Sequence, residues 1–213
     1  MNKTLTRLQE TGIVPVVAME RPDQSSLLAE ALQNGGLPCA EITFRTSAAA
    51  ECIRKISEGF PDILTGAGTI LTIEQVNQAV DAGARFIVSP GLNPKITEYC
   101  LDRGITIIPG CATPSEIEQA LSYGLTVIKF FPAEASGGLD MIKALAAPYT
   151  SVKFMPTGGI NPSNVRKYLN YDRVLACGGS WMVKKELLEC GNFKKIQELA
   201  KEASEIVKEC RRE

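Results

Sequence analysis

Short apolar segments recur along the chain and alternate with segments whose hydrophobic residues have the spacing of an amphipathic helix. Short apolar runs bounded by turn residues are typical of buried strands. We predict eight strands, at residues 13–19, 39–44, 63–67, 85–89, 105–109, 126–131, 152–156 and 174–177. Their starts follow one another at intervals of about 20 to 26 residues, which is enough for a strand, a helix and two short loops.

Helical spacing is found before the first strand and after each of the eight. We predict helices at residues 2–11, 24–33, 48–58, 73–82, 94–101, 114–121, 138–146, 162–169 and 193–210. Three of them begin with a proline that follows a polar capping residue, at Pro94, Pro114 and Pro162. Proline prefers the first position of a helix, so these residues should mark helix starts.

Eight strand and helix units predict an α/β protein with a closed (β/α)8 TIM barrel, preceded by an N-terminal helix. The length of 213 residues suits one domain, so we expect residues 1–213 to form a single barrel domain. A doubly wound open sheet is the alternative, but no Gly-x-Gly-x-x-Gly motif follows the first strand. In a barrel the active site lies at the C-terminal ends of the strands, so the residues that end each run become candidates.

Composition narrows the possible partners and location. The net charge is −1, and the lysines and arginines are scattered, which argues against a nucleic-acid or anionic-membrane surface and favours small molecules or proteins. No apolar run approaches the roughly 20 residues that span a bilayer, and the polar start lacks the core of a signal peptide. We therefore expect a cytoplasmic location.

The chain has seven cysteines and no histidine. The cysteines are odd in number and never form Cys-x-x-Cys, so reduced thiols are expected rather than disulfides or a zinc site. Histidine is the commonest general base and metal ligand, and its absence excludes Ser-His and Cys-His nucleophile systems. Carboxylates and lysine must therefore carry any chemistry.

The sixth predicted strand contains a lysine, Lys129, in an otherwise apolar run. An ammonium taken out of water without a partner costs several kcal/mol, so such a group tends to become a neutral, nucleophilic amine. Alternation puts Lys129 on one face with Val127 and Phe131, near the top of the barrel core if that face points inward. The alternative is a strand-edge lysine that reaches solvent. Lys153 is a rival amine, but it begins its strand and so lies at the opposite end of the barrel.

The second predicted strand has one polar face, with Glu41, Thr43 and Arg45, and one apolar face, with Ile42 and Phe44. The outer face of a barrel strand meets helices and is apolar, so the polar face should point inward. There Glu41 would transfer protons and Arg45 would hold an anion by its two-pronged donor set. The alternative is that Glu41 and Arg45 form an ion pair.

The seventh and eighth strands are each followed by a glycine pair, Gly158-Gly159 and Gly178-Gly179. Such pairs let backbone N–H groups approach an anion, and these two loops form the usual phosphate site of a barrel. A phosphorylated substrate is therefore expected, although turns also use glycine pairs. Thr69 and Pro90, which follow the third and fourth strands, offer a hydroxyl and a shaped wall.

Taken together, these segments resemble the 2-keto-3-deoxy-6-phosphogluconate aldolase family, whose members often also cleave 4-hydroxy-2-oxoglutarate. The matching segments cover nearly the whole barrel in order: Gly12-Ile13-Val14-Pro15-Val16, Glu41-Ile42-Thr43-Phe44-Arg45-Thr46, Gly66-Ala67-Gly68-Thr69, Ser89-Pro90-Gly91, Ile108-Pro109-Gly110, Lys129-Phe130-Phe131-Pro132-Ala133-Glu134, Pro156-Thr157-Gly158-Gly159-Ile160 and Gly178-Gly179-Ser180-Trp181.

The resemblance implies a class I aldolase that forms a homotrimer, uses no metal and no cofactor, and acts on a phosphorylated 2-keto acid. Lys129 would form the Schiff base with the substrate ketone, and Glu41 would be the general acid and base. The other implied contacts are Arg45 and Thr69 with the carboxylate, Pro90 and Phe131 around the pyruvyl part, and Gly158, Gly159 and Ser180 with the phosphate.

One segment departs from the family pattern. Some relatives carry a basic residue late in or just after the first strand, where this chain has Ala18-Met19-Glu20-Arg21, so a basic phosphate contact there must come from Arg21 or be absent. Two other functions fit a phosphate-binding barrel: an isomerase or synthase that forms no imine, and a sugar-phosphate sensor without turnover.

Overall fold

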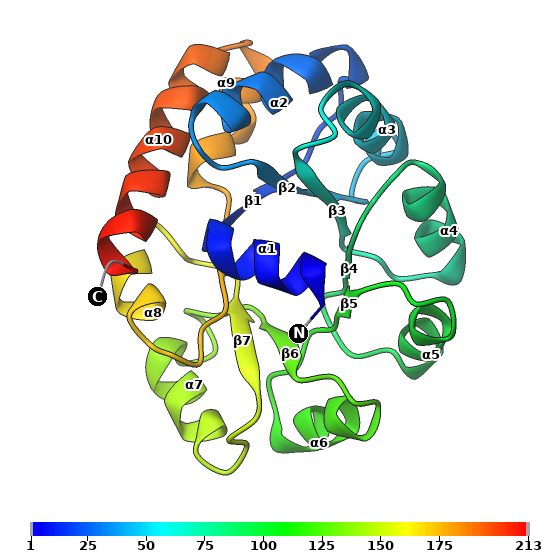
Figure 1. Cartoon of the computed structure of the whole chain (residues 1–213), viewed down its shortest axis with the longest axis vertical. Helices are drawn as coiled ribbons and strands as arrows, with labels where there is room; N and C mark the ends of the chain where they lie inside the picture. The colour runs from blue at the N-terminus through cyan, green and yellow to red at the C-terminus, as the bar shows by residue number, and fades with distance from the viewer. Residues whose placement is uncertain (1, 212–213) are drawn as a thin grey trace.

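A computed structural model describes residues 2–211, and its strands form a barrel surrounded by helices (Figure 1). The strands are β1 (Ile13–Val17), β2 (Cys39–Thr43), β3 (Leu64–Gly68), β4 (Ile87–Val88), β5 (Ile107–Ile108), β6 (Val127–Phe130), β7 (Lys153–Pro156) and β8 (Cys177–Gly179). The helices are α1 (Lys3–Thr11), α2 (Ser25–Asn34), α3 (Ala49–Gly59), α4 (Ile73–Asp81), α5 (Pro94–Asp102), α6 (Pro114–Ser122), α7 (Gly138–Ala146), α8 (Val165–Leu169), α9 (Lys185–Glu189) and α10 (Phe193–Cys210). Short 3-10 turns lie at η1 (Pro22–Gln24) and η2 (Trp181–Val183).

The strands are parallel and close on themselves. Six of them pair in the order β5-β4-β3-β2-β1-β8, and β6 pairs with β7. The two groups are joined at Lys129, whose N–H donates to the Pro109 carbonyl and whose carbonyl accepts from the Cys111 N–H, both at 2.8 Å. On the other side Thr157 bridges Gly178, which joins β7 to β8. Every strand thus has a neighbour on each side, which confirms the barrel and excludes the open sheet.

Alternation along the strands separates two apolar cores. One core fills the barrel interior and consists of Val14, Cys39, Leu64, Phe86, Val88, Ile108, Val127, Met155, Leu175 and Ala176, with Leu8 of α1 below them. Residues of the other core, such as Ile42, Ile87 and Ile128, pack outward against the helices. The helices are held to the barrel by this outer layer, and each strand can present a polar residue inward only above the filled interior.

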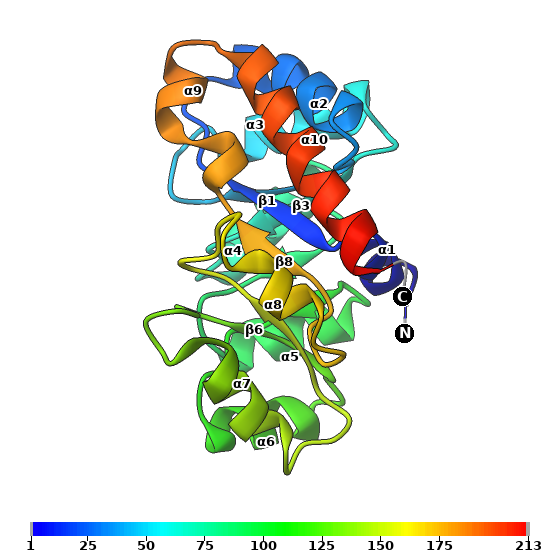
Figure 2. The same ribbon diagram turned by 90° about the vertical axis from the view of Figure 1, so that its left-hand side faces the viewer.

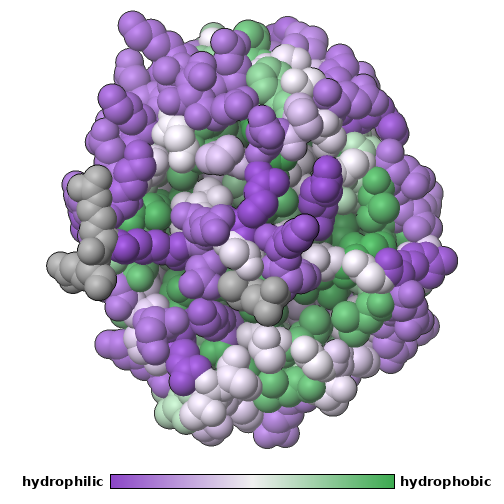
Figure 3. Space-filling model, in the orientation of Figure 1, coloured by the Kyte–Doolittle hydropathy of each residue, from purple (hydrophilic) through white to green (hydrophobic). Residues whose placement is uncertain are grey.

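Helix α1 lies across the N-terminal end of the barrel (Figure 1). The side chain of Asn2 caps it by accepting from the Leu5 N–H at 2.9 Å. Its buried residue, Leu8, joins the inner core, and Gln9 accepts a hydrogen bond from the Lys153 ammonium at 3.3 Å. The same face in Figure 3 is mostly hydrophilic, so α1 turns its apolar side to the barrel and its polar side to solvent. Lys153 therefore lies at the end of the barrel that α1 covers, as its place in the strand predicted.

The long helix α10 runs along the outside of the barrel beside α2 and α8 (Figures 1 and 2). It presents Ile196, Ala200, Ala203 and Val207 to the outer core and keeps its charged residues outside. Among residues 2–211, no helix combines the length and the apolar character needed to cross a bilayer.

Three element predictions differ from the structure. The expected helix start at Pro162 is wrong, because residues 161–164 form a hydrogen-bonded turn and α8 begins at Val165. The eighth strand lies later than predicted, at Cys177–Gly179, because its two glycines gave no strand signal. Helix α9 and the η2 turn, which follow that strand, were not predicted.

Candidate active site

Glu41 and Lys129 meet inside the upper part of the barrel. Each lies two residues beyond a member of the inner core, Cys39 on β2 and Val127 on β6, so each side chain points inward above the apolar layer. The Lys129 Nζ lies 3.3 Å from Glu41 Oε1. Glu41 is 0% exposed and Lys129 is 5% exposed. The strand-edge alternative for Lys129 is therefore wrong, because the amine is buried against a carboxylate.

Glycines on β3 create the space that Glu41 occupies. A Cβ atom at Gly68 would lie 2.1 Å from Glu41 Oε1, and one at Gly66 would lie 2.3 Å from the ring of Phe86. Among the described residues, the second carboxylate oxygen, Glu41 Oε2, is buried without a hydrogen-bond partner. A buried acceptor without a partner is rare and costs free energy, so a polar group of a bound ligand that donates to Glu41 Oε2 would relieve this cost.

Arg45 does not pair with Glu41. Its Nε donates to the Thr43 hydroxyl at 3.2 Å, and that hydroxyl donates to the Val17 carbonyl at 2.9 Å. Within residues 2–211 the carboxylate of Glu41 pairs with Lys129 alone. The ion-pair alternative for Glu41 and Arg45 is therefore wrong, and the guanidinium is held at the barrel mouth.

Five of the predicted site residues line one cavity of about 180 Å³: Arg45, Phe131, Gly158, Gly159 and Ser180. Phe131 connects this cavity to the buried pair, since its ring centroid lies 5.5 Å from Lys129 Nζ and its side chain is 40% exposed. Lys129 and Glu41 are not among the residues that line this cavity, which places a guanidinium, an aromatic wall and two backbone loops beside the buried pair.

The Gly158-Gly159 loop turns its N–H groups toward this cavity. Both glycines have positive φ, 98° and 80°, which side chains disfavour. The carbonyls of Thr157 and Gly158 accept from the Ala133 and Glu134 N–H groups, at 2.8 and 3.1 Å, on the far side of the loop. In a planar trans peptide the N–H points opposite to the carbonyl, so the following N–H groups face the cavity. Such a concave set of N–H groups is an anion site.

The second glycine pair has a different role. A Cβ at Gly178 would lie 2.3 Å from the Thr157 hydroxyl, and one at Gly179 would lie 1.9 Å from the Trp181 ring. These glycines therefore allow close packing of neighbouring side chains. Among residues 2–211, the N–H of Ser180, just beyond them, donates to no other group and can serve an anion.

Thr69 and Pro90 lie apart from the cavity that holds the other predicted residues. Pro90 lines a separate cavity with Ile70 and Leu71. Thr69 follows Gly68 directly and has φ of 58°, a strained backbone for a β-branched residue. Such strain is often retained at functional sites, and it places Thr69 next to the glycine that makes room for Glu41.

Sequence reasoning missed two residues of the site. Thr157 lines the glycine cavity, and its buried hydroxyl has no partner within residues 2–211. Lys184 lines an adjoining cavity that shares Arg45 and Ser180 with the first. Arg21, which was the one possible basic phosphate contact in the segment after the first strand, pairs with Asp23 at 2.7 Å and is largely exposed.

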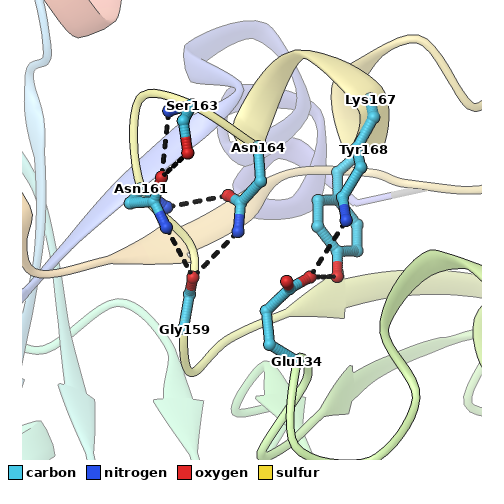
Figure 4. Close-up of polar contacts among 7 residues, drawn as sticks. All are labelled: Glu134, Gly159, Asn161, Ser163, Asn164, Lys167 and Tyr168. Carbon is cyan, nitrogen blue, oxygen red and sulfur yellow. Dashed lines mark hydrogen bonds and ion pairs between the residues drawn. The ribbon is translucent and has the colours of Figure 1, made fainter.

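The Glu134 carboxylate lies beside the glycine loop and is bonded to Tyr168 and Lys167 of α8 (Figure 4). A Cβ at Gly159 would lie 2.7 Å from the Cβ of Glu134. The Tyr168 hydroxyl donates to Glu134 Oε1, and Lys167 Nζ lies 3.4 Å from the same oxygen. The Tyr168 hydrogen bond is the largest cause that holds the pKa of the Glu134 carboxyl below its usual range. Burial, the second largest, opposes it, and the Lys167 ammonium and the Asn164 amide add to the lowering.

Comparison with known proteins agrees with this geometry. The model of the KDPG and KHG aldolase family matches residues 5–199. A 2-dehydro-3-deoxy-phosphogluconate aldolase of Treponema pallidum is 50% identical over 200 residues, which cover 94% of this chain and 95% of that protein.

Two crystal structures show the same fold. The KDPG aldolase of Legionella pneumophila, with pyruvate captured at low pH as a covalent carbinolamine intermediate, has a TM-score of 0.90 and 38% identity, and the match covers 94% of this chain and 97% of that one. The 2-keto-3-deoxy-6-phosphogluconate aldolase of Zymomonas mobilis with 3-phosphoglycerate has a TM-score of 0.87 and 39% identity, over 94% and 93% of the two chains. The fold, the length of the match and the identity together show that the chain belongs to the KDPG and KHG aldolase family.

Proposed function

We propose that the protein cleaves 2-keto-3-deoxy-6-phosphogluconate to pyruvate and glyceraldehyde 3-phosphate through an imine on Lys129. The observation that carries the proposal is the buried pair of Lys129 and Glu41, 3.3 Å apart, beside a cavity with anion donors. A buried amine next to a proton-transferring carboxylate is the arrangement that imine chemistry requires.

The reaction would begin when Lys129 passes a proton to Glu41 and the resulting neutral amine attacks the C2 ketone to form a carbinolamine. Glu41 supplies the proton with which the C2 oxygen leaves as water, and a protonated imine remains. When the C3–C4 bond breaks, its electron pair moves into this imine to give an enamine, and the C4 hydroxyl loses its proton to Glu41. The same carboxyl then protonates C3, and water releases pyruvate from the amine. The imine is the electron sink, so the step is balanced without an oxidant or reductant.

The substrate ends would be held by the groups around the pair. Arg45 and Thr69 would bind the C1 carboxylate, and Pro90 and Phe131 would border the pyruvyl part; the family resemblance supports the roles of Thr69 and Pro90, which do not line the cavity of Arg45 and Phe131. The phosphate would take the N–H groups of the Gly158-Gly159 loop and of Ser180, with Lys184 adding positive charge at the rim. Thr157, whose buried hydroxyl has no partner among the described residues, would serve the hydroxyl-bearing middle of the substrate.

A second substrate is 4-hydroxy-2-oxoglutarate, which would give pyruvate and glyoxylate. The matched family model carries both activities in its description, and the imine chemistry at Lys129 needs no phosphate. The distal carboxylate would then occupy the anion donors of the glycine loop.

Borohydride reduction in the presence of pyruvate tests the proposal. We expect a stable pyruvate adduct on Lys129, located by peptide mass mapping, and no adduct on Lys153, which lies at the covered end of the barrel. The variant Lys129→Arg, which keeps the charge, should give no adduct. An adduct on another lysine, or none, would contradict the mechanism and favour an isomerase, a synthase or a sensor.

Three further expectations belong to this proposal: a homotrimer, a single domain over residues 1–213, and a cytoplasmic location. The trimer is the most direct to test. Size-exclusion chromatography with light scattering should give three times the mass of the chain, and a monomer or dimer would contradict it.

A further inference from the structure

We infer that Asn161 and Asn164 are positioning residues of the anion site, which hold the Gly159 carbonyl so that the next N–H faces the substrate. Asn161 Nδ2 donates to this carbonyl at 3.0 Å, and Asn164 Nδ2 donates to it at 2.9 Å (Figure 4). Two side-chain amides thus converge on one backbone oxygen at the rim of the cavity. The inference rests on the proposed function, in which this loop binds the anionic end of the substrate.

The direction of each amide is set by what its oxygen accepts. Asn161 Oδ1 accepts from the Ser163 N–H at 2.9 Å and from the Ser163 hydroxyl at 2.5 Å. Asn164 Oδ1 accepts from the Asn161 N–H at 2.9 Å. With both oxygens engaged in this way, each Nδ2 is directed to Gly159. The polar turn before α8 is therefore a small network that ends on one carbonyl.

This carbonyl differs from the two before it. The carbonyls of Thr157 and Gly158 are held by backbone N–H groups of the loop after β6, whereas that of Gly159 is held by side chains. Two consecutive glycines restrict the backbone little, so a peptide beside them can rotate unless it is bonded. The amides of Asn161 and Asn164 supply that restraint.

The restraint sets the direction of one donor. Because carbonyl and N–H point opposite ways in a trans peptide, a Gly159 carbonyl held outward turns the Ile160 N–H inward. Ile160 lines the cavity, and within residues 2–211 its N–H donates to no other group. A donor fixed before the ligand arrives binds an anion without an ordering cost, and hydrogen bonds to a charged oxygen are the strong ones. The ligand class is a phosphate or carboxylate group.

Titration with inorganic phosphate, followed by phosphorus NMR, tests the inference without requiring catalysis. We expect Asn161→Ala and Asn164→Ala each to weaken phosphate binding about threefold to tenfold, the loss of one hydrogen bond, and the double variant to weaken it further. Ser163→Ala is the matched control: it removes one donor to Asn161, keeps the backbone donor, and does not touch Gly159. It should change phosphate binding less than about twofold.

The rate of borohydride trapping with pyruvate separates positioning from general damage. Because pyruvate carries no phosphate, trapping on Lys129 should be unchanged in all the variants. Phosphate binding equal to wild type in the asparagine variants would overturn the inference, as would a parallel loss of trapping and phosphate binding. If the double variant does not fold, the single variants decide, since each keeps one amide on Gly159. Absence of trapping in the wild type would contradict the proposed function and leave the phosphate titration interpretable.

Discussion

Substituting Gly68 by alanine should displace the side chain of Glu41, the proposed proton-transfer group, without changing the identity of any charged residue. An alanine Cβ would lie 2.1 Å from Glu41 Oε1 and 2.7 Å from its Cγ and Cδ, whereas ordinary contact begins at 3.4 Å. The carboxylate must therefore retreat by about 1.3 Å, or β3 must move away from β2. Glu41 is fully buried, so the shift must be taken up inside the barrel.

A shift of that size breaks the contact with the amine. The Lys129 Nζ to Glu41 Oε1 distance of 3.3 Å would grow past the 4 Å limit of an ion pair. A misplacement of about 1 Å at a reacting centre costs about 10²-fold in rate, and an overpacked core loses about 1–3 kcal/mol of stability. We expect Gly68→Ala to fold, to melt at a lower temperature, and to lose about 10²-fold in kcat.

The assay is pyruvate release coupled to lactate dehydrogenase, with kcat and KM measured separately. Gly59→Ala is the control, because a Cβ at Gly59 meets no atom within 4 Å and its φ is not positive. It should keep wild-type kcat. A folded Gly68→Ala enzyme with kcat within about twofold of wild type would refute the reasoning, since Glu41 would then tolerate displacement.

Three other outcomes are expected. Glu41→Gln should still bind pyruvate but turn over at least about 10²-fold more slowly, and near-normal kcat would deny Glu41 a role in proton transfer. Tyr168→Phe should be less stable than wild type at pH 7, and urea unfolding at pH 7 and pH 3 should show the gap narrowing in acid. The pKa of the Glu134 carboxyl is lowered in the folded protein, so the ionised carboxylate contributes fully to the free energy of unfolding above the ordinary carboxyl pKa of about 4.3. That contribution is lost as pH falls through the lower pKa of the folded protein. A stability difference between wild type and Tyr168→Phe that does not depend on pH would contradict this. Incubation with a chelator should leave kcat unchanged because the imine is the electron sink, and recovery on adding metal would point to another mechanism.

The barrel was predictable because its alternation is strong. An apolar outer face was enough to predict that Glu41 and Lys129 point into the barrel and that Ile42 and Ile128 point outward, and the structure agrees. The sequence could not predict which inward-pointing side chains meet, because that depends on the relative height of their residues along the barrel axis. Glu41 was therefore open to pairing with Arg45 on its own strand, whereas its partner lies on β6, across the interior.

The cavity residues show a second limit. Gly158-Gly159 and Gly178-Gly179 look alike in the sequence, yet positive φ distinguishes the first pair and close packing against Thr157 and Trp181 explains the second. Lys184 was missed because the cavity it lines is formed by loops from distant parts of the chain. Arg21 was named because it is the basic residue of the segment after the first strand, with absence of a basic contact as the alternative, and its guanidinium pairs with Asp23 two residues later.

Helix α1 also has a kinetic consequence. Because it covers the N-terminal end of the barrel, with Leu8 in the inner core and Gln9 bonded to Lys153, the open end of the barrel is the mouth lined by Arg45 and Phe131. Both cleavage products must then leave by one route. In the proposed mechanism the pyruvyl half stays bonded to Lys129 after the C3–C4 bond breaks, so the aldehyde would leave first and pyruvate last through the same mouth.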